Sequence, residues 1–498
     1  MKTLLTALRH HAHTQPQHLA IDSGEDRLDY QTLVAEVDAA ARHLSTAPVH
    51  RPGPGQTGPA PRPSPGRRQR VGLLLDNGAA WVIADLALLQ AGMTCVPLPA
   101  FFSATQLRHV LADAALDTVL TDRPERLQSL LGRPPDGTLI IGNTSLDCFN
   151  LSTATGPQLP AGTTKITYTS GTTGEPRGVC LDAVSLQAVV TSLAVAVDIH
   201  AGDRSLSLLP LAILLENLAN VYVALQSGAT ACLPALHALG IEGSGLHDPQ
   251  RLLTAIGHCA PTALVLTPAL LEVLVTATDS GWVLPDTVRF MAVGGAPLPA
   301  ALRQRAEQAG FPVYEGYGLS EAASVVSLNR PGETRAGSVG RPLPHVAVHI
   351  ADDGEILLRG ALFLAYLNAA PAAAGKPDWL HTGDLGRLDE DGFLYVTGRR
   401  RAVQIASSGR NLAPHWLETE LQRETTIAAA RIDTEGKTSV EAEITPALGT
   451  TDAAISAAVA RVNQRLPDYA RIARWRRATV PVAPDGSPAG QEHRNLPS

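Results

Sequence analysis

Cysteine is scarce in this chain, and its cysteines show no regular spacing. There are five in 498 residues, and no two of them form a C-x-x-C pair. They are Cys95, Cys148, Cys180, Cys232 and Cys259. An odd number of scattered cysteines is typical of buried thiols in a reducing compartment, rather than of a disulfide framework or a zinc site.

Long apolar segments are scarce too. The N-terminus, MKTLLTALRHHAHTQ, lacks the apolar core of a signal peptide, so we expect a cytoplasmic protein. The stretch Leu206–Leu225 comes nearest to a membrane span, but Pro210, Glu216, Asn217 and Asn220 within it are costly in lipid. We therefore expect a buried segment of a globular domain and no transmembrane segment.

An excess of positive charge is also missing. The formal net charge is −7, which gives no reason to expect nucleic acid as a partner. Lysine in particular is rare, and the basic residues are almost all arginine. The lysines are Lys2, Lys165, Lys376 and Lys437. A hydrophobic content of 45% describes a globular protein, and 498 residues are too many for one ordinary core.

Apolar patterns along the chain predict an α/β fold with mostly parallel sheets. Residues 3–46 have helical spacing around a short strand at Leu19–Ile21. From Arg70 onwards, short apolar runs such as VGLLL, TCVPL and TVLTD alternate with helical segments of ten to fifteen residues. The same alternation returns between residues 181 and 317, with one continuous helix expected over Leu214–Leu225.

Two segments depart from that alternation. Residues 47–70 hold seven prolines, four glycines and five arginines without an acid, which predicts a solvated loop. Residues 345–400 read as short strands separated by Gly and Asp turns, which predicts a small β unit. We place the main boundary at Gly398–Arg401, so that residues 1–398 form a large domain and residues 399–498 a small, mobile α+β domain.

The segment Tyr168–Val179, YTSGTTGEPRGV, carries the clearest chemical signal. Five hydroxyls and three glycines fall within eleven positions and are joined by the cation of Arg177. Glycine lets the backbone approach a ligand closely, and consecutive N–H groups can bind an anion. Pro176 and the glycines oppose a helix, so we expect a phosphate-binding loop. It is not a Walker loop, because no Gly-Lys-Ser/Thr follows at the required spacing.

Further motifs follow this loop in a fixed order. They are the turn at Gly294–Pro297, YEGYGLSE at Tyr314–Glu321, GEILLRG at Gly354–Gly360, HTGDLG at His381–Gly386 and GRRR at Gly398–Arg401. Together they resemble the adenylate-forming superfamily, which includes acyl- and aryl-CoA synthetases, firefly luciferase and the adenylation domains of peptide synthetases. The resemblance covers about residues 15–420 and weakens beyond them. It is strongest toward long-chain fatty acyl-CoA synthetases.

The resemblance implies a two-step reaction. A carboxylate attacks the α-phosphorus of ATP to give an acyl-adenylate and pyrophosphate, and a thiol of coenzyme A or of a carrier protein's phosphopantetheine then takes the acyl group. Such chemistry depends on positioning and on neutralising charge, in part by Mg²⁺. The expected partners are thus ATP, a small carboxylic acid and an acyl carrier protein if coenzyme A is not the acceptor.

The resemblance also assigns roles to residues at matching positions. The β- and γ-phosphates would lie on Thr169, Ser170, Gly171, Thr172, Thr173 and Gly174, with Arg177 beside them. Adenine would lie against Gly295, Ala296, Pro297 and the ring of Tyr317, next to Gly318. Ser320 would donate to the α-phosphate and Glu321 would hold Mg²⁺. Asp384 would accept the ribose hydroxyls, Arg399 would reach the ribose–phosphate side, and Arg401 would be the hinge of the domain motion.

The segment LPLA at Leu209–Ala212, followed by Glu216, resembles a stretch of fatty-acyl synthetases that lines the acyl pocket. Ile213 stands where those enzymes carry a histidine, which makes the wall beside Leu211 more apolar. The charged amine of an α-amino acid would stay unpaired there. A medium- or long-chain fatty acid is therefore the expected substrate.

Two cations depart from the family pattern. The loop has Arg177 where the family has lysine, which keeps the charge but changes its geometry. A C-terminal lysine that bridges carboxylate and α-phosphate is replaced by Gln491, and no lysine follows Lys437. Loss of one such donor costs about 10²–10³ in rate, and Arg494 lies near enough in sequence to substitute. The sequence leaves open a working ligase, an enzyme of the thioester step alone, and a non-catalytic homologue that binds nucleotide and acyl group.

Overall fold

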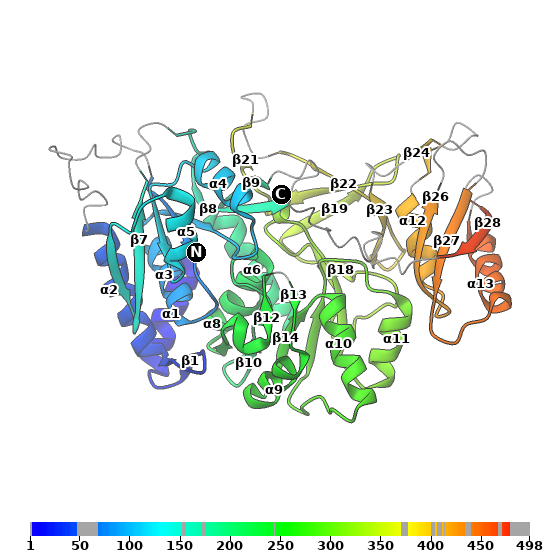
Figure 1. Cartoon of the computed structure of the whole chain (residues 1–498), viewed down its shortest axis with the longest axis horizontal. Coiled ribbons are helices and arrows are strands. Elements are labelled where there is room, and N and C mark those ends of the chain that lie inside the picture. The colour runs from blue at the N-terminus through cyan, green and yellow to red at the C-terminus, as the bar shows by residue number, and fades with distance from the viewer. Residues whose placement is uncertain are drawn as a thin grey trace, which may run out of the picture.

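The computed structural model describes residues 2–46, 68–151, 156–170, 176–243, 245–369, 377–399, 404–405, 411–412, 414–433, 440–466 and 471–478. Two large sheets with their helices form most of the described chain, and a smaller group of strands and helices lies at one end (Figure 1). The segment expected as a loop at residues 47–70 lies outside the description up to residue 67, and its last residue already begins a strand.

The first sheet has eight strands among the described residues. In spatial order they are β21 (Ala365–Tyr366), β9 (Pro176–Asp182), β8 (Thr163–Ser170), β4 (Thr94–Pro97), β3 (Arg70–Leu74), β5 (Thr118–Thr121), β7 (Thr144–Asn150) and β6 (Gly137–Ile141). Its centre, β8-β4-β3-β5, is parallel, and both edges are antiparallel. The central strands β3, β4 and β5 are buried along their whole length, as in a parallel sheet that is covered on both faces.

The second sheet has nine strands among the described residues. In spatial order they are β18 (Arg341–Pro342), β17 (Ser327–Leu328), β16 (Val313–Tyr317), β15 (Phe290–Val293), β14 (Ala263–Leu266), β10 (Arg204–Leu206), β11 (Thr230–Cys232), β1 (Leu19–Asp22) and β2 (Arg27–Asp29). It is parallel from β16 to β1. Because parallel strands align their carboxyl ends, residues that follow β15 and β16 lie at one edge of this sheet.

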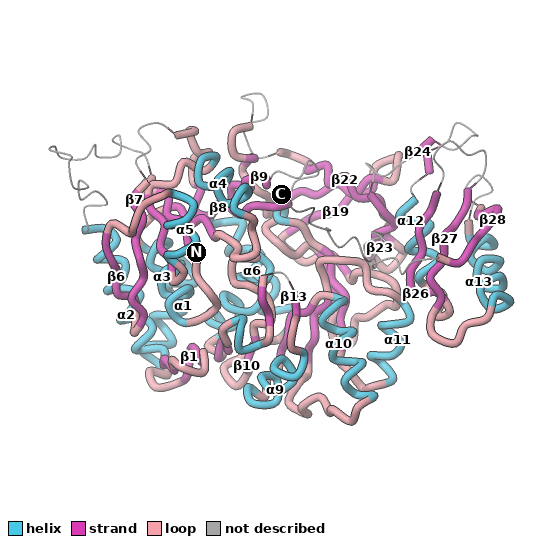
Figure 2. The backbone as a smooth tube through the Cα atoms, viewed as in Figure 1, coloured by secondary structure: helices cyan, strands magenta, loops and turns pink. Residues whose placement is uncertain are grey.

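Helices flank both sheets (Figure 2). The longer ones before the four-stranded sheet are α1 (Lys2–Thr14), α2 (Tyr30–Thr46), α3 (Ala79–Gln90), α4 (Ala104–Asp113), α5 (Pro124–Leu131), α6 (Ala183–Val197), α9 (Pro249–Cys259), α10 (Pro268–Asp279) and α11 (Ala300–Gln308). Side-chain caps fix several starts: Asp182 accepts from the N–H of Ser185 at 2.7 Å to begin α6. α3 is buried along nearly its whole length, which explains its apolar sequence on every face.

The helix expected over Leu214–Leu225 is interrupted. It consists of α7 (Leu214–Glu216), a π-helical turn η1 (Asn217–Tyr222) and α8 (Val223–Ser227). A π turn adds one residue to the helical repeat and often marks a functional site. Here it turns Asn217 toward α3 and β8 and Asn220 toward β10, so both amides find buried partners. The stretch Leu206–Leu225 is thus largely buried, as expected, and no described helix is long and apolar enough to span a bilayer.

The last part of the described chain holds two smaller sheets. One consists of β19 (Val346–Ile350), β20 (Glu355–Gly360), β22 (Leu380–Leu388) and β23 (Leu394–Arg399), all antiparallel. The other consists of β26 (Ile427–Asp433), β27 (Val440–Pro446) and β28 (Ile472–Arg477), with α12 (Pro414–Gln422) and α13 (Asp452–Arg465). It has its own apolar core. Short hairpins β12–β13 (Ile241–Glu242, Gly245–Leu246) and β24–β25 (Gln404–Ile405, Asn411–Leu412) complete the set.

The predicted fold class is confirmed, and most predicted elements appear close to their expected positions. Besides the continuous helix over Leu214–Leu225, a second local prediction was wrong. Tyr168–Val179 is not a loop throughout, because β8 runs to Ser170 and β9 starts at Pro176, which makes the segment the end of a β-hairpin. The strands persist despite their polar sequence because β8 pairs with β4 and β9 pairs with β21. The domain boundary at Gly398–Arg401 stays a prediction.

Candidate functional site

The β8–β9 hairpin brings Thr169 and Arg177 directly opposite each other at its end. The intervening residues Gly171–Glu175 lie outside the described residues, as does the side chain of Ser170, so Gly171, Thr172, Thr173 and Gly174 are not placed. The nearby Tyr168 points away from the hairpin end. Its hydroxyl donates to Asp113 Oδ2 at 2.6 Å, and burial raises its pKa.

Gly178 has a packing role that the sequence did not reveal. Its backbone does not need a positive φ, but a Cβ at this position would lie 3.0 Å from the Cβ of Leu367 and 3.2 Å from Ile166. The glycine therefore allows the edge strand β21 to lie close to β9. Anion binding is not required to explain it.

A link across the site joins Arg177, Tyr366 and Glu321. The Arg177 guanidinium lies over the Tyr366 ring, 3.7 Å from its centroid. The Tyr366 hydroxyl donates to Glu321 Oε1 at 2.8 Å. Tyr366 was not anticipated, because its partners lie far away in sequence and no local motif marks it. Residues of the hairpin and of the short helix η3 (Ser320–Ala322) are thereby connected.

Tyr317, Asp384 and Arg399 form the second polar group of the site. The Tyr317 hydroxyl donates to Asp384 Oδ2 at 2.6 Å, and Arg399 Nε lies 2.8 Å from Asp384 Oδ1. Asp384 is almost fully buried, whereas the Arg399 side chain is 68% exposed. Burial and the neighbouring carboxylate raise the pKa of Tyr317, which keeps its proton and donates.

The turn that carries Asp384 is held by a buried acid, Glu355. Its Oε1 accepts from the N–H of Gly383 at 2.9 Å, and its Oε2 lies 2.9 Å from His381 Nδ1. The Thr382 hydroxyl accepts from the N–H of Asp384 at 3.0 Å. Asp384 therefore sits at a fixed position on β22, paired with Arg399 on β23. The contact of His381 with Glu355 is part of the network that holds this turn.

The remaining predicted nucleotide residues lie at the carboxyl edge of the nine-stranded sheet. Gly295 follows β15 with φ of +82°, which favours glycine, and Ala296 and Pro297 after it are exposed. Gly318 follows β16, where an added Cβ would lie 1.7 Å from the carbonyl oxygen of Ser324. A side chain at Gly318 would thus push apart the backbone that precedes Ser320.

A cavity of about 230 Å³ opens at this edge. Its lining includes Gly295, Tyr317 and Ser320 at the sheet edge and Ala263 and Phe290 at the opposite ends of β14 and β15. Along the strands this is roughly 13 Å at about 3.3 Å per residue. No charged side chain of the described chain lines it. The cavity is therefore an apolar pocket with a polar rim.

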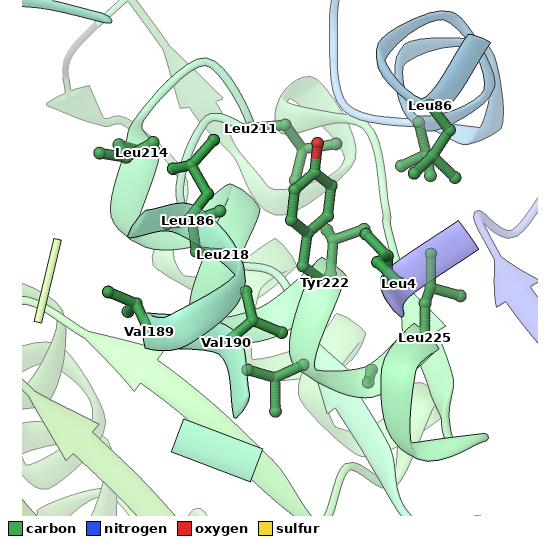
Figure 3. Packing of buried hydrophobic residues seen from close by; sticks show 14 of the residues in the cluster. Leu4, Leu86, Leu186, Val189, Val190, Leu211, Leu214, Leu218, Tyr222 and Leu225 are labelled. Atoms are coloured by element: carbon green, nitrogen blue, oxygen red, sulfur yellow. The ribbon is translucent and has the colours of Figure 1, made fainter. Parts of the chain in front are cut away.

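Of the two residues expected in the acyl pocket, only Ile213 lines the cavity. The side chain of Leu211 lies instead in the main hydrophobic core, in the cluster with Leu218 and Tyr222 (Figure 3). Its N–H donates to Asn77 Oδ1 at 2.8 Å, which fixes the backbone so that the side chain packs inward.

Beneath one wall of the cavity lies a neutral polar network. Asn220, which lines the cavity, accepts from the Ser205 hydroxyl and donates to Glu216 Oε1, both at 2.6 Å. Glu216 also accepts from the N–H of Leu208 at 3.1 Å. Complete burial raises the pKa of Glu216 to about 8, so at pH 7 the carboxyl is mostly protonated. The wall thus presents no net charge to a ligand.

Three further predicted residues cannot be placed. Arg401, Gln491 and Arg494 lie outside the described residues. The described residues thus form two connected polar groups, Arg177–Tyr366–Glu321 and Tyr317–Asp384–Arg399, and of the predicted nucleotide residues Gly295, Tyr317, Gly318 and Ser320 line the apolar cavity.

Comparison with known protein families identifies the chain. The AMP-binding enzyme family model matches residues 64–366, more than half of the sequence. The chain belongs to the AMP-binding enzyme family. Sequence relatives of this AMP-binding enzyme include the long-chain-fatty-acid–CoA ligase FadD15 of Mycobacterium bovis, 28% identical over 73% of this chain and 71% of the relative. A 2-succinylbenzoate–CoA ligase of Bacillus cereus is 26% identical over 87% of this chain and 85% of the relative.

Solved structures confirm the fold of this AMP-binding enzyme. The anthranilate CoA ligase AuaEII, in complex with anthranoyl-AMP, superposes with a TM-score of 0.75 at 19% identity, covering 97% of this chain and 95% of the other. The O-succinylbenzoate coenzyme A synthetase of Bacillus subtilis, in complex with ATP and magnesium ion, superposes with a TM-score of 0.70 at 24% identity and covers 97% of each chain. The arrangement of a large N-terminal and a small C-terminal domain is shared with these structures.

Proposed function

We propose that this protein is an AMP-forming acid–thiol ligase that activates a fatty acid with ATP and transfers the acyl group to a thiol. One observation supports this most directly: the apolar cavity opens beside Tyr317 and Ser320, on the rim that also carries Glu321. An acid bound with its tail in the cavity would place its carboxylate at that rim. There it would meet the α-phosphate of a nucleotide held by Tyr317 and Asp384.

The proposed nucleotide site extends along the rim. The polyphosphate lies on residues 169–174 and Arg177, adenine against the 295–297 turn and the Tyr317 ring, and the ribose hydroxyls on Asp384. Arg399, with its exposed guanidinium, faces the ribose–phosphate side. Each of these roles follows from the family resemblance, and the contacts among Tyr317, Asp384 and Arg399 agree with it.

Mg²⁺ fits this rim through Glu321. Mg²⁺ keeps several waters and is usually bound through one or two carboxylates plus substrate phosphates, so a cage of protein ligands is not needed. Accordingly, the described residues contain no group of three or more His, Cys, Asp or Glu side chains that could hold a metal alone. Bound there, Mg²⁺ would neutralise phosphate charge.

In the first step, a carboxylate oxygen of the acid forms a bond to the α-phosphorus as the bond to the β-phosphate oxygen breaks, which releases pyrophosphate. The chain's own residues orient both reactants, and Ser320 donates to the α-phosphate. In the second step, a thiolate attacks the acyl carbon and AMP leaves. Coenzyme A is the first candidate acceptor because relatives bear CoA ligase names, and a carrier protein is the second.

The volume and charge of the cavity restrict the range of acids that could bind there. An apolar cavity of about 150 Å³ holds benzene, which has six carbons, so a cavity of about 230 Å³ is large enough for a chain of roughly eight to nine carbons. A second carboxylate, as in 2-succinylbenzoate, would find no cation among the described lining residues. We therefore favour a medium-chain monocarboxylic acid over a long-chain or dicarboxylic one.

The proposal includes a large domain of residues 1–398 and a small domain of residues 399–498, with a hinge at Arg401. The small three-stranded sheet with its own core supports a separate C-terminal unit. The reaction is placed in the cytoplasm, where the free thiols of all five cysteines would stay reduced.

A second candidate function is binding without turnover. It is favoured by Gln491, which stands where the family carries a charged lysine. Such a homologue would bind nucleotide and acyl group without reaction. An enzyme that catalyses the thioester step alone is a separate alternative. Glutamine can donate a hydrogen bond but lacks the charge that stabilises the transition state.

The test is ATP–pyrophosphate exchange with straight-chain acids of increasing length and with 2-succinylbenzoate. We expect exchange to be highest near eight carbons and absent with 2-succinylbenzoate. Gln491→Lys should raise the rate, and loss of exchange in Arg494→Ala would assign the missing donor to Arg494. No exchange by any form, despite measurable ATP binding, would overturn the ligase proposal.

A cavity-filling variant sharpens that test. Ala292 on β15 lines the cavity, and Ala292→Phe should occupy its middle. We expect exchange with an eight-carbon acid to fall at least tenfold while butyrate is affected little, since burial of each methylene contributes about 0.8 kcal/mol. An equal loss with both acids would contradict the proposed binding direction.

A further inference from the structure

The short strand β21 connects the two halves of the proposed nucleotide site. Tyr366 of β21 pairs with Val179 on β9, the outgoing strand of the phosphate hairpin. Just before it, the N–H of Phe363 donates to the carbonyl of Glu321 at 2.7 Å. The segment 363–366 is thus bonded through its backbone to the hairpin on one side and to η3 on the other.

The Tyr366 side chain also connects the hairpin to η3, through contacts with the charged groups of Arg177 and Glu321. At 3.7 Å from the ring centroid, the flat Arg177 guanidinium must lie along the ring face, which leaves its N–H donors at its edge. At the other end of the ring, the hydroxyl donates to Glu321 at 2.8 Å. The Phe363 ring packs edge-on at 4.8 Å and limits the rotation of Tyr366.

We propose that Tyr366 is a positioning residue that sets Arg177 and Glu321 together, so that phosphate and metal are bound in one geometry. This inference rests on the proposed nucleotide site. The ring holds the Arg177 cation beside the phosphate hairpin, and the hydroxyl orients the Glu321 carboxylate for Mg²⁺. Removing only the hydroxyl should affect Mg²⁺ binding at Glu321, and removing the ring should also affect phosphate binding by Arg177.

The same link explains why an arginine can stand in the place of the family's lysine. A guanidinium stacks on an aromatic face while its donors remain available, whereas a lysine ammonium over the ring directs part of its donors into that face. Arg177 and Tyr366 therefore act as a pair. Replacing either one should remove the same interaction.

The experiment measures ATP binding to the full-length protein by calorimetry, with and without Mg²⁺. Tyr366→Phe keeps the ring, so its affinity for ATP without Mg²⁺ should lie within twofold of wild type. The Mg²⁺ concentration that gives half of the Mg²⁺-dependent gain in ATP affinity should rise about three- to tenfold, because the hydrogen bond to Glu321 is lost. Tyr366→Leu and Arg177→Lys should each weaken ATP alone about three- to tenfold. The double variant Tyr366→Leu with Arg177→Lys should bind ATP no more weakly than the weaker-binding of the two single variants, because both substitutions remove the same interaction.

The chain offers a matched control in Tyr395. The Arg387 guanidinium lies over its ring at 3.8 Å, and its hydroxyl donates to Asp389 at 3.2 Å. This trio has the same chemistry away from the proposed rim. Tyr395→Phe should leave both ATP and Mg²⁺ titrations unchanged. A change equal to that of Tyr366→Phe would overturn the positioning role, as would additive losses in the double variant.

The result is separable from the ligase proposal because binding needs no turnover. If MgATP binds with the expected variant pattern but no acid supports pyrophosphate exchange, the Tyr366 role stands and the ligase proposal fails. If exchange occurs and Tyr366→Phe leaves the Mg²⁺ titration unchanged, the Tyr366 role fails and the ligase proposal stands.

Discussion

Two buried aspartates of this protein have nearly the same partners, a tyrosine hydroxyl and a cation, but the exposure of the cation differs. Asp85 accepts from the Tyr222 hydroxyl at 2.6 Å and from Lys165 Nζ at 2.9 Å. Asp384 accepts from the Tyr317 hydroxyl at 2.6 Å and lies 2.8 Å from Arg399 Nε. The cations differ: the Lys165 side chain is 4% exposed, and that of Arg399 is 68% exposed.

The difference separates a structural ion pair from one that a ligand can reach. The Lys165 cluster lies inside the domain, where Asn217 of the π turn completes it at 2.6 Å and joins β8 to η1 and α3. At Asp384, by contrast, the exposed cation can move aside or turn toward a bound nucleotide. The same chemistry therefore serves packing at Asp85, and at Asp384 it is arranged as the proposed binding role requires.

The largest expected effect comes from breaking the buried pair. Lys165→Met would leave the Asp85 carboxylate inside the core without a cation, and we expect a loss of about 3–5 kcal/mol in the free energy of unfolding. Urea unfolding at pH 7 measures it. Adding Asp85→Asn should recover much of the loss, because the uncompensated charge is then gone.

The exposed cation supplies the control for that prediction. Arg399→Met should lower the free energy of unfolding by less than Lys165→Met, because the Arg399 guanidinium is 68% exposed although Asp384 itself is buried. If the two substitutions destabilised the protein equally, the distinction drawn from exposure would be wrong.

The second effect concerns binding at the other aspartate. Asp384→Asn keeps the shape but removes the charge that is proposed to accept the ribose hydroxyls. We expect ATP to bind about 10- to 100-fold more weakly, as for the loss of hydrogen bonds to a charged group. Calorimetry measures it. Asp391→Asn, at an exposed partner of Arg335, should leave ATP binding unchanged, and equal losses in both would argue for a general charge effect.

The sequence could predict much of the α/β framework because strand and helix periods differ. It could not predict that Lys165 is buried. In KITYTS the lysine alternates with apolar residues as a solvent-facing residue would, and its partners lie 80 and 52 residues away. The π turn was also beyond reach, since only the buried partners of Asn217 and Asn220 explain the extra residue.

The candidate site shows the same limit. Tyr317, Asp384 and Arg399 sit in recognisable motifs, and the resemblance identified all three. Tyr366 follows no such motif, and its hydroxyl meets a carboxylate 45 residues away only because β21 pairs with β9. Local patterns therefore identify candidates for a common ligand site, while a contact such as that of Tyr366 with Glu321 depends on pairing between distant strands.

Glu216 is a third buried carboxyl, and no cation of the described chain is among its hydrogen-bond partners, so it shows how burial alone changes the pKa of an acid. It is held by Asn220 and backbone donors, and burial raises its pKa to about 8. Between the ordinary pKa near 4.3 and pH 8 the folded state keeps a proton that the unfolded chain has lost. Stability from this group is therefore complete below that window and falls by up to about 1.4 kcal/mol per pH unit as pH rises through it.

Glu216→Gln should remove that slope while keeping the hydrogen bond to Asn220. Urea unfolding at pH 5.5, 6.5 and 7.5 compares the two proteins, and the stability of wild type relative to the variant should decrease at each step. Glu272→Gln, at an exposed position of α10, is the matched control and should run parallel to wild type. Parallel profiles for Glu216→Gln would mean that the carboxyl is charged, and the wall of the cavity would then carry a negative charge that repels a second carboxylate even more strongly.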